Sequence, residues 1–177
     1  TYYEIDPTVV DVARDPSMFT FLRDCTPRAT VTLGDGRLTL AKVPDHTYDL
    51  IVVDAFGGDA IPVHLLTREA IELYLAKLKP DGALLFNISN KYVDIGSVLA
   101  GEAGALGLAS YVRADFDVTP EEAALGKVQS AWLVMSRNDA NLSGLPNMPG
   151  WQSQTSSDQS PVWTDDFSDL LAVMRLG

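Results

Sequence analysis

The chain has 177 residues, of which 46% are hydrophobic and 21% are charged, so it is long enough for one domain with a sizeable core. Its formal net charge of −11 argues against nucleic acid as a partner, because phosphate binding needs a basic face, but it suits a cationic ligand such as an amine. No apolar run approaches the roughly 20 residues that span a bilayer, and Cys25 is the only cysteine, which excludes a disulfide framework and a cysteine-based metal site.

The first third of the chain alternates strand and helix signals. Residues 2–5 predict a short strand, and Asp6 can cap a following helix that has Pro7 at its first position. A second strand over residues 29–33, rich in β-branched side chains, stops at Gly34-Asp35-Gly36. Shorter helical segments are expected at residues 19–24 and 37–43.

The middle of the chain holds the most strongly apolar strand. Residues 48–53 are almost continuously apolar, which is typical of a parallel strand buried on both faces, and the run ends at Asp54. A loop over residues 55–66 leads to Thr67, which caps an amphipathic helix. A further strand is expected over residues 83–88.

The last third carries one more helix and two more strands. We expect the helix over residues 95–106 and the strands over residues 109–113 and 129–136. Residues 138–161 are rich in Asn, Ser, Gly, Pro and Gln without periodicity, which predicts a long loop or a poorly ordered segment. Residues 162–177 predict a C-terminal helix, capped by Thr164, that packs on the domain formed by residues 1–137.

Strands that alternate with helices imply an α/β fold with a mostly parallel, doubly wound sheet of the Rossmann type. In such sheets ligands bind outside the carboxyl ends of the strands. Polar residues follow four of the predicted strands at that edge, namely Glu4, Asp35, Asp54 and the pair Ser89-Asn90. Their clustering indicates a ligand site more strongly than any one of them does.

Three acidic residues near the beginning can contact a nucleotide. Glu4, at the end of the first strand, can accept hydrogen bonds from ribose hydroxyls, or it is a solvated strand end. Asp35, between two glycines, can meet an exocyclic amine such as that of adenine, or it satisfies the backbone of its own turn. Asp6 is better explained as a helix cap than as a ligand contact.

Asp54 and Asp59 are the candidate catalytic pair. A carboxylate at the end of an apolar strand is expected to be partly desolvated, which makes it a better base. Asp59 follows in a glycine-bearing loop, and two carboxylates near one pocket can hold a protonated amine and accept its proton, although Asp59 can equally be an ordinary loop residue. Tyr92 can line the same pocket. No metal is expected, because His46 and His64 are the only histidines and lie far apart in sequence.

The order and spacing of several motifs resemble the spermidine synthases, or polyamine aminopropyltransferases. These motifs are Tyr3-Glu4-Ile5-Asp6-Pro7, Gly34-Asp35-Gly36, residues 48–54 and Leu78-Lys79-Pro80-Asp81-Gly82. Residues 54–67, Ser89-Asn90-Lys91-Tyr92 and Trp163-Thr164-Asp165-Asp166 look more narrowly like bacterial spermidine-synthase-like proteins, in which the domain is often fused to membrane segments. The resemblance implies a Rossmann fold of the class I methyltransferase type and a cytoplasmic location, free or as the cytoplasmic domain of a membrane protein.

The resemblance also implies roles for individual residues. The counterpart of Glu4 binds ribose hydroxyls and that of Asp35 contacts adenine, with Asp6 and Gly36 beside them in the cofactor site. The counterpart of Asp54 begins the catalytic loop, borders the cofactor and helps to deprotonate the attacking amine. The donor would be decarboxylated S-adenosylmethionine, and the acceptor a diamine. The residues then expected on the amine side are Asp59, Ser89, Asn90 and Tyr92.

The sequence departs from the family pattern at two places. The family usually has its second catalytic-loop aspartate three residues after the first, followed by proline, whereas here Asp59 lies five residues after Asp54 and Pro62 comes later. This leaves room for an acceptor other than a diamine. The family's first strand and its glycine-rich turn are also missing, and that strand normally lies between those at residues 2–5 and 48–53. Without it, backbone groups in the middle of the sheet would lack partners.

Three functions are compatible with these observations. They are aminopropyl transfer, methyl transfer from S-adenosylmethionine itself, and a non-catalytic role in nucleotide binding or assembly. The chain begins with Thr rather than Met, and we expect it to be an N-terminally truncated part of a longer transferase that is inactive by itself. The missing strand would come from another segment, another chain or the second copy in a homodimer.

Overall fold

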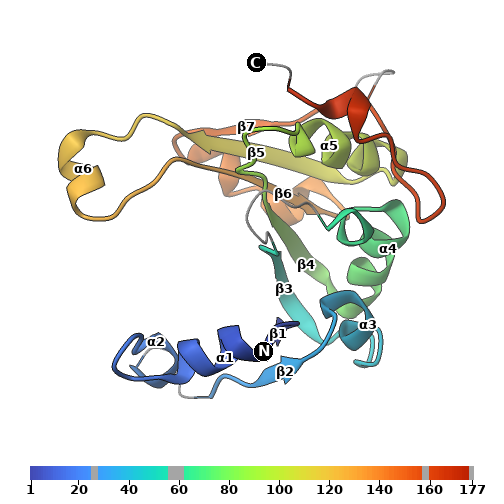
Figure 1. Ribbon diagram of the computed structural model, residues 1–177. Coiled ribbons are helices and arrows are strands. Elements are labelled where there is room, and N and C mark those ends of the chain that lie inside the picture. Colours follow the sequence, from blue (N-terminus) through green and yellow to red (C-terminus); the bar gives the residue numbers. More distant parts are fainter. Residues whose placement is uncertain (25–27, 56–61, 157–159, 176–177) are drawn as a thin grey trace. The chain divides into compact units, whose positions relative to one another are not determined.

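The structure, a computed structural model, describes residues 1–24, 28–55, 62–156 and 160–175. The chain divides into two compact units, Thr1–Pro44 and Asp45–Gly177. Both units combine helices with a pair of parallel strands (Figure 1), so the predicted α/β class is confirmed.

Over its described residues, 1–24 and 28–44, the first unit is a small parallel sheet with three short helices. Its strands are β1 (Tyr2–Glu4) and β2 (Val31–Leu33), and its helices are α1 (Pro7–Arg14), α2 (Phe21–Asp24) and α3 (Gly36–Leu40). Asp6 caps α1 as predicted, because its Oδ1 accepts the backbone N–H of Thr8 at 2.8 Å, and Pro7 begins the helix. The local signals at this end of the chain therefore fold as their chemistry predicts.

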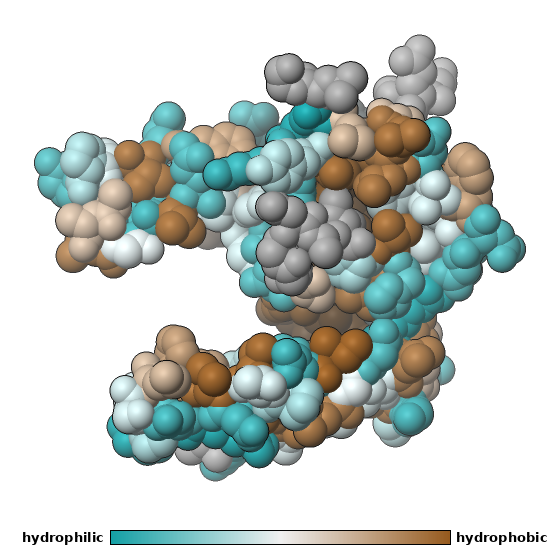
Figure 2. All heavy atoms as spheres, in the orientation of Figure 1, coloured by the Kyte–Doolittle hydropathy of each residue, from teal (hydrophilic) through white to brown (hydrophobic). Residues whose placement is uncertain are grey.

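The first unit has little apolar interior. Among its described residues, Val10 and Leu40 are the only buried apolar side chains. Large apolar side chains remain exposed at Ile5, Val9, Val12, Met18, Phe19, Leu33 and Leu38. Figure 2 shows the resulting hydrophobic surface over this unit. Exposed apolar surface of this kind marks a site of interaction with another molecule or segment.

The second unit is built on a five-stranded sheet in the order β3-β4-β6-β5-β7 (Figure 1). Its strands are β3 (Tyr48–Val53), β4 (Leu78–Asn87), β5 (Ala109–Asp115), β6 (Ser130–Ser136) and β7 (Trp151–Ser153). β3 and β4 are parallel, and β6 runs antiparallel to both β4 and β5. The predicted strands β3, β4 and β5 therefore point the same way, while β6 is inserted between β4 and β5 in the opposite direction.

In the described part of the second unit, three helices and four short turns accompany the sheet. The helices are α4 (Arg68–Lys77), α5 (Ile95–Ala105) and α6 (Pro120–Ala124), and the 3₁₀ turns are η1 (Val63–Leu65), η2 (Asp139–Leu142), η3 (Leu145–Asn147) and η4 (Leu171–Val173). α4 packs on β4, and α5 packs on β5 and β6. The core contains the fully buried Leu84, Phe86, Leu99 and Leu133. β4 therefore runs through this core, whereas no residue of β3 is buried, so the predicted burial of residues 48–53 on both faces is wrong.

Residues 138–156 are more regular than the predicted long loop. They contain η2, η3 and the edge strand β7, which pairs antiparallel with β5. Leu142 is buried against Tyr111 and Val134, and the hydroxyl of Tyr111 donates to Asp139 Oδ1 at 2.7 Å. Tertiary packing of one leucine and pairing with a strand far away in sequence therefore order a segment whose composition alone indicates a loop.

The predicted helix over residues 162–177 is wrong within the described residues, which end at residue 175 and contain only the single turn η4. Thr164 does not cap a helix, because it exchanges backbone hydrogen bonds with Phe167. The segment is held instead by bonds to distant elements. The N–H of Arg68 donates to the carbonyl of Trp163 at 2.8 Å, and that of Asp94 donates to Val173 at 2.8 Å. These tertiary bonds outweigh the helix propensity of a short segment.

Candidate functional site

Asp54 and Asn87 meet at the carboxyl ends of two adjacent parallel strands. The register pairs Val53 of β3 with Phe86 of β4, so the residues that follow them are neighbours. Nδ2 of Asn87 donates a hydrogen bond to Oδ1 of Asp54 at 2.9 Å. Asp54 is exposed, so its expected partial desolvation is not found. The result is a carboxylate with one oxygen fixed by an amide, while its second oxygen has no partner among the described residues.

Asn87 is a site residue that the sequence analysis missed. Its side chain also accepts the backbone N–H of Ser89 through Oδ1 at 2.9 Å. The amide therefore connects the candidate catalytic carboxylate to the loop that follows β4. Asn87 is the last residue of β4, and β4 lies parallel to β3, the strand that ends just before Asp54. The sequence shows that Asn87 ends an apolar strand, but only the register of β3 with β4 shows that it lies next to Asp54.

Ser89 and Asn90 shape the loop after β4. The Ser89 hydroxyl accepts the N–H of Ala131 at 2.8 Å and lies 3.3 Å from its carbonyl oxygen. Oδ1 of Asn90 accepts the N–H groups of both Tyr92 and Val93 at 2.9 Å. Both residues thus hold the loop in place. The side chain of Tyr92 is exposed, while Asp59 lies outside the described residues.

Glu4 and Asp35 lie at the carboxyl edge of the small sheet in the first unit. The N–H of Gly34, which precedes Asp35, donates to the carbonyl of Glu4 at 2.9 Å. Oε1 of Glu4 accepts the N–H of Asp6 at 2.9 Å, and Oδ1 of Asp35 accepts that of Leu38 at 2.8 Å as the cap of α3. Both carboxylates are therefore oriented by backbone donors at one edge of this sheet.

Gly36, the remaining predicted cofactor residue, begins α3. A Cβ atom built there would come no closer than 3.9 Å to its nearest neighbour, a side-chain atom of Tyr3. Packing within the described residues therefore does not require glycine at this position. The predicted residues form one group in each unit, with Glu4, Asp6, Asp35 and Gly36 in the first unit and Asp54, Ser89, Asn90 and Tyr92 in the second.

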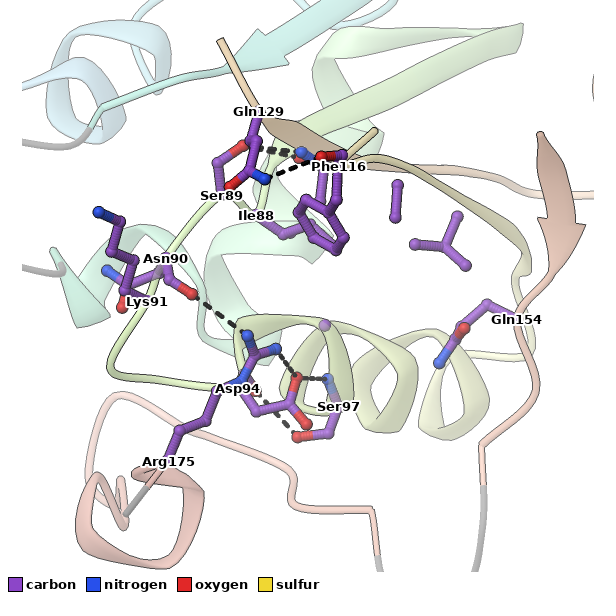
Figure 3. Close-up of a pocket in the computed structure, with 14 residues that line it drawn as sticks. Ile88, Ser89, Asn90, Lys91, Asp94, Ser97, Phe116, Gln129, Gln154 and Arg175 are labelled. Atoms are coloured by element: carbon purple, nitrogen blue, oxygen red, sulfur yellow. Dashed lines mark hydrogen bonds and ion pairs between the residues drawn. The ribbon is translucent and has the colours of Figure 1, made fainter. Parts of the chain in front are cut away.

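A cavity of about 360 Å³ opens beside the loop after β4 in the second unit (Figure 3). Two of the predicted site residues, Ser89 and Asn90, line this cavity. Its other polar and charged lining residues are Lys91, Asp94, Ser97, Gln129, Gln154 and Arg175. Apolar side chains, including those of Ile88, Val112 and Phe116, contribute the rest. Its size and mixed lining are those of a small-molecule site.

One buried acid lies away from these groups. Glu102 of α5 is completely buried, and its Oε1 accepts the backbone N–H of Trp163 at 2.5 Å. Oε2 of Glu102 and Nε1 of Trp163 have no hydrogen-bond partner among the described residues. Burial raises the pKa of Glu102 to about 7, with the Trp163 hydrogen bond opposing the shift. The proton on this group therefore depends on pH near neutrality.

In the part of the chain that the structure describes, no group of three or more His, Cys, Asp or Glu side chains is arranged to hold a metal ion. In the same residues, no helix combines the length and apolar character needed to cross a membrane.

Comparison with curated proteins finds relatives among the polyamine-synthesising transferases. The chain is 26% identical over 144 residues to spermidine synthase 1 of Pisum sativum, which covers 80% of this chain and 38% of that protein. It is 37% identical over 86 residues to the polyamine aminopropyltransferase of Vibrio vulnificus, which covers 48% of this chain and 27% of that protein. The chain thus spans less than half the length of these curated relatives. No protein-family model matches it.

Comparison with solved structures identifies the fold. The probable spermidine synthase from Corynebacterium glutamicum matches with a TM-score of 0.59 and 16% identity, over 95% of this chain and 64% of that chain. The spermidine synthase from Thermotoga maritima matches with a TM-score of 0.58 and 17% identity, over 99% of this chain and 56% of that chain. The expected spermidine-synthase-like Rossmann fold is therefore confirmed.

Proposed function

This chain is related to the spermidine synthases, and from that premise we propose that it forms part of an enzyme that transfers an aminopropyl group from decarboxylated S-adenosylmethionine to an amine. The observation that carries the proposal is the carboxylate of Asp54, held by Asn87 at the carboxyl ends of two adjacent parallel strands. That edge is where open α/β sheets bind their ligands.

The reaction needs a proton acceptor beside the nucleophile. The lone pair of the acceptor nitrogen attacks the aminopropyl carbon bonded to the sulfonium, and the carbon–sulfur bond breaks with its electrons going to sulfur. Methylthioadenosine leaves, and the new ammonium gives up one proton. Asp54 accepts this proton through the oxygen that Asn87 does not hold. In this proposal Asp59 supplies the second carboxylate that holds the protonated amine.

The first unit supplies the nucleoside contacts in the proposed enzyme. Glu4 accepts hydrogen bonds from the ribose hydroxyls and Asp35 accepts one from the adenine amine, while Asp6 and Gly36 shape the turns that present them. The backbone donors that orient both carboxylates support this assignment. On the amine side, Ser89, Asn90 and Tyr92 belong to the loop beside Asp54. The intact protein would work in the cytoplasm, free or attached to membrane segments.

We propose further that β3 pairs on its open side with a strand that the described residues of this copy of the chain do not supply. Among the described residues β3 has a strand partner on one side only, β4. Leu50 and Val52 on β3 are about half exposed, at 51% and 50%. An apolar strand with an open edge is normally covered or paired. The strand would come from another segment of the intact protein, from a different chain or from a second copy of this one.

Calorimetric titration tests the donor. The intact protein and this chain would each be titrated with decarboxylated S-adenosylmethionine, S-adenosylmethionine and methylthioadenosine. We expect the intact protein to bind the decarboxylated donor more tightly than S-adenosylmethionine. The decarboxylated donor lacks the carboxylate of S-adenosylmethionine, so its binding site need not accommodate one. Tighter binding of S-adenosylmethionine would indicate methyl transfer instead. If none of the three compounds bound to the intact protein, a non-catalytic role would be indicated.

The base is tested by Asp54→Asn in the intact protein. This substitution keeps the size of the side chain but removes the proton acceptor, so turnover should fall at least ~100-fold. Asp49→Asn is the matched control on the same strand, because Asp49 is exposed and pairs with Lys79. Equal activity of the Asp54 variant and the control would refute the role of Asp54.

A further inference from the structure

The cavity beside the loop after β4 has a chemical character of its own. Figure 3 shows the guanidinium of Arg175 at one end, between Asn90 and Asp94, with Phe116 and Ile88 across the hollow and Gln154 at the far side. Lys91 stands at the outer rim near Asn90 (Figure 3). Two cations and one carboxylate therefore border a cavity in a chain whose formal net charge is −11.

One oxygen of the single carboxylate at this cavity is already bonded. Oδ1 of Asp94 accepts the backbone N–H of Ser97 at 3.3 Å and an N–H of Arg175 at 3.3 Å. The Arg175 guanidinium makes only one other contact among the described residues, to the carbonyl of Asn90 at 3.4 Å. Both bonds of the guanidinium are long, so it retains donor capacity for a ligand. Lys91 pairs with no carboxylate in the described part of the chain.

The arrangement at this cavity disfavours an ammonium group and favours an anion. A ligand ammonium would have to compete with Arg175 for Asp94, while a carboxylate could accept hydrogen bonds from the planar guanidinium. The first turn of α5, which borders the same end, adds a favourable field for negative charge. The rest of the cavity suits an uncharged body, because Ile88, Val112 and Phe116 present apolar surface.

The amide of Gln129 is a polar group among the apolar lining residues of the cavity. Its Nε2 donates to the carbonyl of Phe116 at 2.8 Å, which fixes the side chain and its orientation. Among the described residues the amide oxygen of Gln129 has no partner, so it remains available as an acceptor. The ligand body is therefore expected to be mainly apolar, and a donor group on it could meet the amide oxygen of Gln129.

We propose that this cavity binds a small organic carboxylate whose carboxylate meets Arg175, with Lys91 adding positive charge at the rim, and whose apolar body lies against Ile88, Val112 and Phe116. The cavity shares Ser89 and Asn90 with the proposed transferase site, but this proposal does not rest on that one, because the ligand's head group meets Arg175 rather than Asp54. Binding of such a ligand can be measured with or without turnover, so the failure of one proposal leaves the other standing.

The test compares three probes that share one apolar body and differ only in the head group: 4-phenylbutanoate, 4-phenylbutanol and 4-phenylbutylamine. Dissociation constants would be measured by NMR titration of the labelled chain. We expect the carboxylate to bind at least about tenfold more tightly than the amine, and the alcohol to lie between them. Backbone shifts should be largest for the loop after β4 and the first turn of α5. Equal or tighter binding of the amine, or no binding of the carboxylate, would overturn the proposal.

The cation is tested by Arg175→Gln, which is safe for folding because the Arg175 side chain is 52% exposed. This variant should lose most of the preference for carboxylate over amine, and Lys91→Gln should lose a smaller part. Arg14→Gln, an exposed arginine on α1 of the first unit, is the matched control and should keep the full preference. A preference unchanged in the Arg175 variant, or lost equally in the Arg14 control, would show that the head group does not bind in this cavity.

Discussion

The two units of this chain differ in how they bury apolar surface. The second unit buries Leu84, Phe86, Leu99 and Leu133 completely between its sheet and helices. The first unit has similar strands and helices but leaves most of its large apolar side chains exposed. Secondary structure can thus follow from local signals in both units, while an independent core forms in only one. The stability of the first unit is therefore expected to depend on polypeptide that covers it.

The largest expected effect is on the free energy of unfolding, when the same Leu→Ala substitution is made in each of the two units. Leu133→Ala removes a fully buried side chain of β6 and should cost about 2–5 kcal/mol, through lost burial and a residual cavity. Leu38→Ala removes a side chain that is 66% exposed and should change stability by less than about 0.5 kcal/mol. Urea unfolding followed by tryptophan fluorescence and by far-ultraviolet circular dichroism measures both. Similar losses in the two variants would contradict the contrast between the units.

Glu102 gives the second unit a pH dependence of its own. Because burial raises the pKa of Glu102 to about 7 from an ordinary 4.5, the folded state holds the proton more tightly than the unfolded state. Its contribution to stability should therefore be fully present below pH 4.5 and be lost as pH rises to about 7. The loss totals about 3 kcal/mol.

Glu102→Gln measures this contribution, since it retains a neutral side chain of the same shape. The free energy of unfolding of the Gln variant should fall less between pH 5 and 8 than that of the wild type. Glu121→Gln, at an exposed residue of α6, should keep the wild-type profile. Identical pH profiles for the wild type and the Glu102 variant would show that the proton on this side chain does not stabilise the fold.

The smallest expected effect lies in the first unit. Asp6→Ala removes the cap of α1 and should cost about 1 kcal/mol of local helix stability. Hydrogen exchange of the α1 amides should accelerate, while the unfolding of the second unit, followed by tryptophan fluorescence, should not change. Asp11→Ala, at an exposed position within the same helix, is the control. A shift of the second unit's transition in the Asp6 variant would show that the two units unfold together.

Sequence reasoning succeeded where the determinants are local. Asp6 with Pro7 predicts α1, Thr67 predicts the start of α4, and the apolar run that ends at Asp54 predicts β3. It failed at residues 162–175, where backbone bonds to α4 and to the loop after β4 replace a helix. Those bonds join residues about 80 to 95 positions apart, which no local propensity can encode.

The candidate site was predicted only in part for the same reason. Asp54 stands out because a carboxylate ends an apolar strand, but Asn87 gains its role only from the register of β3 with β4. Glu102 resembles any helical glutamate in the sequence, and its burial follows from the packing of Trp163 on α5. The cavity combines residues from the loop after β4, from α5, β5 and β6, and from the C-terminal segment, so its lining is a product of the tertiary fold.

Gly101 on α5 faces backbone rather than side chains. A Cβ atom at this position would lie 2.1 Å from the carbonyl oxygen of Pro161, so any other residue would push that backbone away from the helix. The same stretch of chain continues to Arg175, at the mouth of the cavity. A substitution at position 101 would therefore alter the placement of a cation that it does not touch. In evolutionary terms, a position outside the lining of the cavity constrains the segment that carries one of its cations.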